Sequence, residues 1–473
     1  MTKKKETLII RELTVTGAGA KGRGIAKSPD GRVIFIPFSA PGDLVDVQVT
    51  KKRRSHMEGR IVKIHEPSKL RTSPKCKHFG ICGGCKWQHL DYKEQLAIKE
   101  ETVRSNLIRI GHLELPRIMP ILAAPQPYYY RNKMEFSFSN QRWLTAEEIA
   151  EQDTLVHRNG LGLHIPGRWD RVLDLQECLL QAAPSNEIRL SIRNYALENA
   201  ITFFDPKQHS GVLRTLMIRT TSTGEIMVLL QCFEPRMEQI NRVLEHLKNT
   251  FPQITSLLYV INQKANDTLY DQEIFCYAGK DHLIENMDQL KFKITAKSFY
   301  QTNSEQAHSL YKVVKDFASL KGDEIVYDLY SGTGTIAQFI ASDARQVIGI
   351  ESVPDAVEAA RENAKLNGIT NTQFHAGDMR YELNDTLVST YGKPDVVITD
   401  PPRDGMHKDV IAQLLKMDPP TIVYVSCNSA TQARDLALLD EIYAIEKVQP
   451  VDMFPQTHHV ENVVLLKKRS TQA

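Results

Sequence analysis

From about residue 296 onward, short apolar runs alternate in a regular order with amphipathic stretches. Strands are predicted at residues 324–329, 346–350, 372–375, 395–399 and 421–426. The intervening residues 354–367 are predicted to form a helix, with Pro354 in its first turn and Gly368 just past its end. Residues 444–452 and 460–467 have no helix between them and are predicted to pair antiparallel at the sheet edge. Strand–helix alternation requires a parallel sheet with helices on both faces, so the pattern predicts an α/β domain over residues 296–473.

The first part of the chain has a different pattern. Short strands separated by Gly and Pro turns are predicted at residues 8–13, 33–37, 44–50 and 59–64. Many short strands with such turns indicate a small β-barrel, which we place at residues 1–66. The basic run Lys51-Lys52-Arg53-Arg54 falls between two of these strands and is predicted to project from a loop.

Residues 67–295 are predicted to form a central α+β domain. A helix is expected over residues 92–110, with Leu96, Val103, Leu107 and Ile110 on one face. Strands are expected at residues 134–138, 216–219 and 226–231. The chain of 473 residues is therefore expected to be multidomain.

The charge distribution bears on the partner. Residues 1–75 hold 17 Lys+Arg and 7 Asp+Glu, a balance of +10, so the rest holds 42 against 50, a balance of −8. A basic module on a mildly acidic body suits a polyanion such as a nucleic acid, although a solvated basic arm would give the same counts. We find no apolar signal-peptide core and no run approaching the roughly 18–20 apolar residues of a membrane span, so a cytoplasmic protein is expected.

A glycine-rich turn indicates a nucleoside cofactor. Gly332-Thr-Gly334 directly follows a predicted strand and opens a helix, and Glu351 ends the next strand. The glycines allow the backbone to turn tightly near a ligand, and a carboxylate there can accept hydrogen bonds from ribose hydroxyls. The alternative is a structural turn with a solvent-exposed Glu351.

Asp400-Pro-Pro-Arg403 favours a methyltransferase over a dehydrogenase. It ends the fourth predicted strand, at the edge where open α/β sheets bind ligands. Amino-group methyltransferases typically have an aromatic residue after such a Pro-Pro pair, so Arg403 argues against methylation of an exocyclic amine. A purely structural role for the motif is the competing reading.

Cys427 ends the fifth predicted strand, next to the strand that carries Asp400. Methylation of uracil carbon 5 needs a thiolate that adds to carbon 6 and a base that then removes the carbon 5 proton. A helix starting near Ser429 is expected to lower the pKa of the Cys427 thiol.

For the general base, the candidates are Glu461, His458 and His459. An inert buried cysteine and a surface ion pair at Glu461 are the alternatives, and no third ligand supports a metal site at the two histidines.

Three further cysteines lie within ten residues, as Cys76-x5-Cys82-x2-Cys85. A disulfide framework is not expected in a large chain without an export signal, so the group indicates a metal site. His89 would complete a zinc site, whereas Cys178 would give the four thiolates that suit an iron–sulfur cluster.

Several motifs together resemble the bacterial RNA uracil-5-methyltransferase family, of the 23S rRNA type. They are Phe299-Tyr-Gln301-Thr-Asn303, Asp328-Leu-Tyr330-Ser-Gly332, Asp400-Pro-Pro-Arg403, Ser426-Cys427-Asn428 and His459-Val-Glu461. Residues 22–26, 35–37 and 41–43 resemble a TRAM domain, an RNA-binding barrel. Two positions depart from the family pattern, Ser429 where Pro is usual and Ser331 where Cys is common.

The resemblance implies a fold and a set of roles. It implies a Rossmann-like class I methyltransferase domain that binds S-adenosylmethionine through Gln301, Tyr330, Glu351 and Asp400, with Asp378 near the adenine. Cys427 would be the nucleophile and Glu461 the base. A 4Fe–4S cluster would be held by four cysteines: Cys76, Cys82, Cys85 and Cys178.

The expected partner is RNA, most specifically 23S rRNA, with the chain acting as a monomer away from membranes. Tyr128-Tyr-Tyr-Arg131-Asn-Lys133 can stack a base and hold phosphates, or its tyrosines can belong to the core. A tRNA enzyme of this family typically lacks the barrel and the cysteine group, and an RNA cytosine enzyme has a different cysteine arrangement. From a different class, a catalytically idle iron–sulfur RNA-binding protein remains the alternative.

Overall fold

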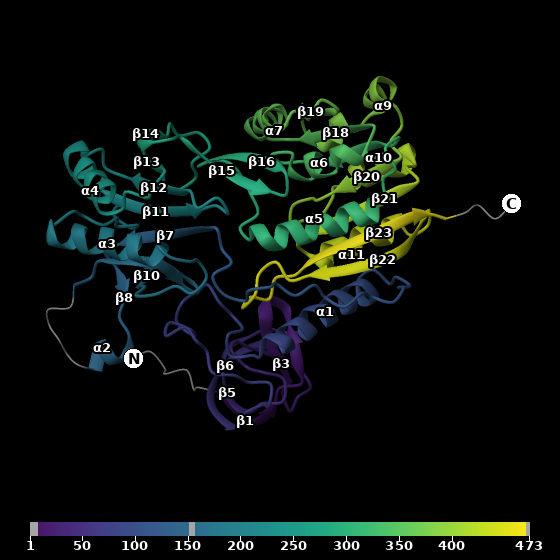
Figure 1. The fold of residues 1–473 in the computed structure, drawn as a ribbon. Coiled ribbons are helices and arrows are strands. Elements are labelled where there is room, and N and C mark those ends of the chain that lie inside the picture. The colour runs from purple at the N-terminus through teal and green to yellow at the C-terminus, as the bar shows by residue number, and fades with distance from the viewer. Residues whose placement is uncertain (1–7, 151–156, 470–473) are drawn as a thin grey trace.

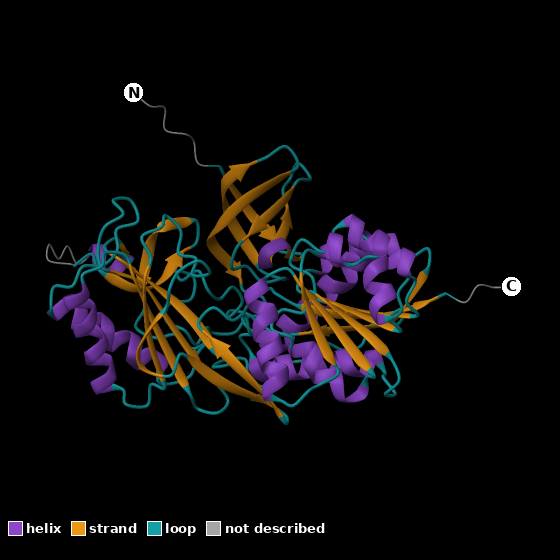
Figure 2. Cartoon of the chain, turned by 90° about the horizontal axis from the view of Figure 1, so that it is seen from above, coloured by secondary structure: helices purple, strands orange, loops and turns teal. Residues whose placement is uncertain are grey.

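The computed structural model describes residues 8–150 and 157–469, which form three main sheets (Figures 1 and 2). The first sheet has six strands in the order β1-β5-β6-β4-β3-β2. Ile34, Ile36, Val45, Val47 and Met57 fill its interior, since residues two apart on a strand point to the same face. The strands are β1 (Ile9–Thr14), β2 (Gly17–Gly19), β3 (Arg23–Lys27), β4 (Val33–Ile36), β5 (Leu44–Lys52) and β6 (His56–Glu66), with a 3-10 turn at Ala20–Gly22. Because β5 continues to Lys52, only Arg53 and Arg54 of the basic run lie in the turn, and the prediction of a four-residue loop was wrong.

The central sheet has eight strands in the order β14-β13-β12-β11-β7-β9-β10-β8, and two helices, α3 and α4, pack together in its hydrophobic core. Its strands are β7 (Lys133–Ser139), β8 (Arg142–Trp143), β9 (Gly160–Ile165), β10 (Arg168–Asp174), β11 (Leu213–Thr220), β12 (Ile226–Cys232), β13 (Ser256–Ile261) and β14 (Phe275–Gly279). Its helices are α2 (Ala146–Ala150), α3 (Ser185–Glu198) and α4 (Met237–Thr250). A hairpin of β15 (His282–Met287) and β16 (Leu290–Thr295) leads to the third sheet, where the Lys293 amide donates to Asn363 Oδ1 at 2.8 Å.

The third sheet has the order β19-β18-β17-β20-β21-β23-β22: its first five strands are mutually parallel, β23 is antiparallel to β21, and β22 is antiparallel to β23. The predicted alternation and the antiparallel final pair are therefore confirmed. The strands are β17 (Ile325–Leu329), β18 (Gln346–Glu351), β19 (Thr372–Ala376), β20 (Val396–Thr399), β21 (Thr421–Ser426), β22 (Tyr443–Val451) and β23 (Glu461–Lys468). The helices are α5 (Ser304–Ala318), α6 (Thr335–Ile340), α7 (Pro354–Leu366), α8 (Met379–Glu382), α9 (Asp385–Tyr391), α10 (Lys408–Met417) and α11 (Ser429–Leu439), with a 3-10 turn at Ala341–Asp343.

Helix α1 (Tyr92–Arg109) runs beside β22 and α11, between the third sheet and the N-terminal barrel (Figure 1). Asp91 caps its start by accepting the Lys93 amide at 2.9 Å. Its buried positions are Gln95, Lys99, Val103 and Leu107, at a spacing of four. The predicted face was therefore wrong at two positions, because Leu96 is only half-buried and Ile110 is exposed. Within residues 8–150 and 157–469, no helix combines the length and the apolar character that crossing a bilayer requires.

Candidate active site

Cys427 and Glu461 meet at the carboxyl edge of the third sheet. Cys427 directly follows β21, and Glu461 begins β23, which is antiparallel to β21. Their chain neighbours Ser426 and Asn462 pair with each other, and the charge of Glu461 acts on the Cys427 thiol. Asp400 follows β20, the strand on the other side of β21. The tertiary structure thus brings together the two catalytic candidates and one of the cofactor candidates.

Asn428 fixes the turn that carries Cys427. Its side-chain oxygen accepts the Ala430 amide at 3.2 Å, and its amide group donates to the Arg403 carbonyl at 2.9 Å. Asn428 therefore caps α11 and ties it to the Asp400-Pro-Pro-Arg403 loop. Ser429, where the family usually has Pro, has a buried hydroxyl that accepts a hydrogen bond from Asn106 Nδ2 at 2.8 Å. The departure from the family pattern thus adds a link between α11 and α1.

Cys427, Glu461 and Asp400 are shielded from water, and the pKa values of all three are raised. Burial and the nearby Asp400 raise the pKa of Glu461 to about 8. Burial raises the pKa of Asp400 to about 7. Burial and the charges of Glu461 and Asp400 raise the pKa of the Cys427 thiol to about 11. The expectation of a lowered thiol pKa was therefore wrong, since desolvation and two neighbouring carboxylates outweigh the helix N-terminus and Arg403.

The glycine-rich turn leaves room for a ligand. A Cβ on Gly332 would meet no atom within 4 Å, whereas a Cβ on Gly334 would come within 2.9 Å of Phe374 and Ala360. Gly332 thus faces open space, and Gly334 is required for packing. Glu351 Oε2 accepts the Gly332 amide at 3.0 Å, which places the carboxylate beside that space. The turn and Glu351 therefore fit a nucleoside such as that of S-adenosylmethionine.

Two more cofactor candidates lie near this turn. Tyr330 is half-buried in a left-handed conformation with φ of 63°, a rare state for a residue with a side chain. The backbone carbonyl of Gln301 accepts from Asn132 Nδ2 at 2.9 Å, and within the described part of the chain its side-chain amide has no hydrogen-bond partner. The Gln301 amide is thus available to a ligand.

Sequence reasoning did not give Asp328 a role of its own. Its carboxylate is buried at the end of β17 and accepts the Ala337 amide at 3.1 Å, which fixes the first turn of α6. Burial and Asp400 raise its pKa to about 8. The sequence signal that could have identified Asp328 is its place as the one acidic residue in the otherwise apolar or aromatic strand Ile325–Leu329. Asp378, expected near the adenine, caps α8 and forms an ion pair with Arg380 at 2.5 Å.

The four cysteines of the second site line one apolar cavity: Cys76, Cys82, Cys85 and Cys178. Leu163, Leu175 and Leu180 also contribute to its wall. Among the described residues, no group of three or more His, Cys, Asp or Glu side chains is arranged to hold a metal ion. His89 does not line the cavity, and its Nε2 lies 3.2 Å from the Ser39 carbonyl instead. Four thiols around a shared cavity fit a multinuclear cluster, and a Cys3His zinc site does not fit the position of His89.

The remaining candidates divide between core and surface. Tyr130 is largely enclosed and donates its hydroxyl to the Pro455 carbonyl at 3.0 Å, so its role is structural. Tyr129 is 48% exposed and is available for stacking. The rings of His458 and His459 lie 4.2 Å apart, and burial lowers their pKa values to about 4 and about 3, so both are neutral at pH 7.

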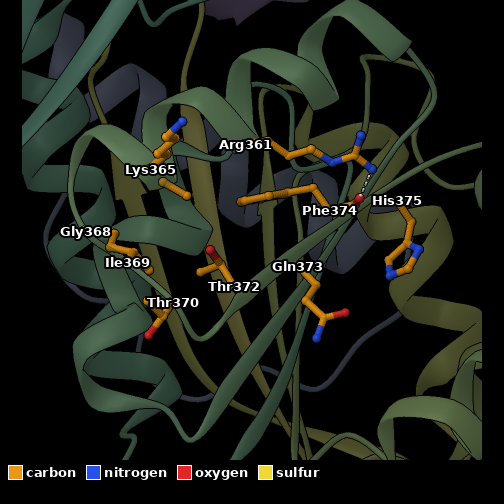
Figure 3. A pocket seen from close by; sticks show the side chains of 10 residues that line it. Arg361, Lys365, Gly368, Ile369, Thr370, Thr372, Gln373, Phe374 and His375 are labelled. Atoms are coloured by element: carbon orange, nitrogen blue, oxygen red, sulfur yellow. Dashed lines mark hydrogen bonds between the residues drawn. The ribbon is translucent and has the colours of Figure 1, made fainter.

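A wide groove among the described residues lies away from this chemistry. It measures about 580 Å³ and lies between α7 and the edge strand β19, with Arg361, Lys365, Phe374 and His375 in its lining (Figure 3). None of the predicted catalytic, cofactor or metal residues lines it. The candidate site is therefore defined by the sheet edge and not by the size of a concavity.

Comparison with known proteins agrees with this geometry. A family model for tRNA (uracil-5-)-methyltransferases matches residues 213–469, and a TRAM domain model matches residues 9–62. The chain belongs to the RNA uracil-5-methyltransferase family. Two relatives of this methyltransferase are named as uncharacterized RNA methyltransferases. The Porphyromonas gingivalis protein is 54% identical over 97% of this chain and 100% of its own length. The Bacteroides thetaiotaomicron protein is 52% identical over 95% of this chain and 100% of its own length.

A solved structure also matches the RNA methyltransferase over nearly its whole length. The Pyrococcus abyssi tRNA (uracil-54, C5)-methyltransferase, in complex with S-adenosyl-L-homocysteine, is 28% identical with a TM-score of 0.73. The match covers 96% of this chain and 99% of that one. Since the N-terminal barrel must lie largely within such a match, its presence does not by itself separate enzymes for ribosomal RNA from enzymes for transfer RNA.

Proposed function

We propose that this RNA methyltransferase transfers a methyl group from S-adenosylmethionine to carbon 5 of a uridine. The observation that carries the proposal is the convergence of Cys427, Glu461 and Asp400 at one edge of three neighbouring strands, β21, β23 and β20. A thiol and a buried carboxylate side by side are the two groups that carbon 5 methylation requires.

Each residue then has a defined task. The Cys427 thiolate adds to carbon 6 of the uracil, which makes carbon 5 nucleophilic. S-adenosylmethionine, when bound, supplies an electrophilic methyl group to carbon 5. Glu461 takes the proton from carbon 5, and the electron pair of that bond reforms the carbon 5–carbon 6 double bond as the thiolate leaves. Glu351 and Gln301 orient the cofactor, and Asn428 keeps the Cys427 turn against the Asp400 loop.

We assign a 4Fe–4S cluster to Cys76, Cys82, Cys85 and Cys178. The support is the family resemblance together with the convergence of the four thiols on one apolar cavity. The methylation chemistry does not use the cluster, so we assign it a role in holding the loop of residues 76–89.

The target we propose is 23S rRNA, with transfer RNA as the second candidate. The first is supported by the family resemblance of the four-cysteine site. The second is favoured by the full-length similarity to the Pyrococcus abyssi tRNA enzyme.

One experiment tests the reaction and identifies the target. Ribosomal and transfer RNA are purified separately from a strain that lacks the gene and from its parent, and 5-methyluridine is mapped in each pool. Loss of a 5-methyluridine from 23S rRNA, restored by the wild-type gene, supports the first target. Loss confined to transfer RNA replaces it with the second. If both pools keep every 5-methyluridine, the proposed function is wrong.

A further inference from the structure

The nine-residue loop between β22 and β23 (residues 452–460) leads directly into Glu461. This loop, yellow in Figure 1, extends toward the barrel and the region of the cysteine loop. A Cβ on Gly22 of the barrel would lie 2.8 Å from Cβ of His458, so the two segments are in close contact. The position of Glu461 therefore depends on parts of the chain outside its own domain.

Helix α1 holds the beginning of the loop. Lys99 Nζ lies 2.5 Å from Asp452 Oδ1 and donates to the Phe454 carbonyl at 3.1 Å. Tyr92 donates its hydroxyl to Asp452 Oδ2 at 2.9 Å. Both members of the ion pair are fully buried, so separating them would leave a charge in the protein interior without its partner.

Gln456 is the junction in the middle of the loop. It is 2% exposed and adopts a left-handed conformation with φ of 66°. Its carbonyl accepts the amides of Lys86 and Trp87, at 2.8 and 3.1 Å, and both follow the last cysteine of the cluster loop, Cys85. Gln95 of α1 pairs with it twice, accepting its backbone amide at 3.0 Å and donating to its side-chain oxygen at 3.0 Å.

A left-handed conformation at a non-glycine residue costs free energy, and it persists only where the surroundings over-determine it. Here those surroundings are the cysteine loop and α1. Gln456 lies five residues before Glu461, and the turn there directs the chain through His458 and His459 into β23. The cysteine loop thus contacts the base-carrying loop directly, through main-chain hydrogen bonds that do not depend on the side chains of Lys86 and Trp87.

We propose that Gln456 is a positioning residue that couples the cysteine loop to Glu461, so that an intact cluster site is required for proton removal from carbon 5 and not for thiolate addition to carbon 6. This inference rests on the proposed function, because it assigns the coupling to one of its two half-reactions. The thiolate comes from the turn between β21 and α11, which is held by Asn428 and Ser429 and does not contact Gln456 through any of these hydrogen bonds.

The two half-reactions can be measured separately on whole protein purified anaerobically. The probes are total RNA from the deletion strain and the same RNA substituted with 5-fluorouridine. With fluorine at carbon 5 there is no proton to remove, so the covalent complex accumulates and reports thiolate addition and methyl transfer. With native uridine, release of methylated RNA reports proton removal.

The variants are Gln456→Ala, which keeps a Cβ at the left-handed position, and Gln95→Ala. The control is Gln231→Ala, because Gln231 is buried in β12 of the central sheet, where its side-chain amide donates to the Asp267 carbonyl at 3.3 Å, and it does not line the cysteine cavity.

For Gln456→Ala we expect the fluorouridine adduct to form at a rate within about two-fold of wild type. Release from native RNA should slow by about ten- to a hundred-fold, as expected for a misplaced catalytic group, and a methylated covalent complex should accumulate. Gln95→Ala should also slow release from native RNA more than adduct formation, and Gln231→Ala should change neither rate. Equal losses in both assays, or wild-type release in both Gln456→Ala and Gln95→Ala, would overturn the inference.

A second measurement tests the link to the cysteine site without relying on activity. In Cys82→Ser, amide hydrogen exchange of residues 452–460 should be faster than in wild type, while exchange in β17 and β20 stays unchanged. Unchanged exchange in residues 452–460 would contradict the coupling. If wild-type protein forms no adduct and no methylated RNA, the proposed function fails, whatever the exchange result.

Discussion

Lys99 and Asp452 form an ion pair in which both side chains are fully buried, although they lie 353 residues apart in the chain. Burial lowers the pKa of Lys99, and the charge of Asp452 opposes that shift. Breaking such a pair leaves an uncompensated charge, so Lys99→Ala should reduce the free energy of unfolding by about 3–5 kcal/mol, measured by denaturant titration. Arg104→Ala on the same helix removes a partly exposed pair with Glu101 and should cost less than about 1 kcal/mol. Equal effects of the two substitutions would contradict the assignment.

Cys427 is the proposed nucleophile. Cys427→Ala should abolish the covalent adduct with RNA that contains 5-fluorouridine, because Cys427 is the thiol on which the charges of Glu461 and Asp400 act. Adducts are measured as a shift of labelled RNA in a denaturing gel. The matched control is Cys276→Ala, which removes an exposed thiol and should leave the adduct intact. An adduct that persists in Cys427→Ala would end the assignment.

Glu461 is the proposed base. In Glu461→Gln the methyl group should still be transferred, but the carbon 5 proton should stay in place, so that a methylated covalent complex accumulates with native RNA. Product release should fall by about 10²- to 10⁴-fold, the usual contribution of a general base. The measurement is the ratio of protein-bound to free methylated RNA. Normal turnover in this variant would remove Glu461 from the role.

The buried carboxylate also predicts a dependence of stability on pH. The pKa of Glu461 is raised to about 8 in the folded protein from an ordinary value of 4.5, so the folded state holds a proton that the unfolded state has lost. Its stabilising contribution is complete below pH 4.5 and disappears as the pH rises through 8. At about pH 8.5, Glu461→Gln should therefore increase the free energy of unfolding by on the order of 2 kcal/mol. The gain should shrink near pH 5, and a gain that is independent of pH would contradict the raised pKa.

The cysteine cavity predicts a coloured protein. Anaerobically purified wild type should absorb near ~400 nm, as iron–sulfur clusters do, whereas a zinc–thiolate site is colourless. Cys82→Ala and Cys178→Ala should both lose this absorption, because both thiols line the cavity. Cys232→Ala is a control at a buried cysteine outside the cavity and should keep it. Stoichiometric zinc with no absorption would replace the cluster with another metal.

Much of the methyltransferase half was predictable because its information is local. Hydrophobic periodicity located β21 at residues 421–426 and the antiparallel pair β22 and β23 within one residue at most ends. Motif spacing then put Asp400 and Cys427 on neighbouring strands, since consecutive units of an alternating α/β chain tend to lie side by side. Helix α1 was less predictable, because its buried positions include Gln95 and Lys99, and hydrophobic periodicity assigns such polar residues to the solvent-facing side.

By itself, the sequence determined the α/β architecture, the nucleophile candidate and the grouping of Cys76, Cys82 and Cys85, because periodicity, turn residues and short motifs encode them over a few tens of residues. That Cys178 belongs with these three was implied by the family resemblance, and the tertiary structure brings all four to one cavity. Only the tertiary structure decided that Lys99 meets Asp452, that Gln456 is held by the loop after Cys85, and that Cys427 has a raised pKa. The physical reason is the same in all three. Burial of a charge, a thiol or a main-chain carbonyl depends on which distant segment removes the water, and no local pattern specifies that segment.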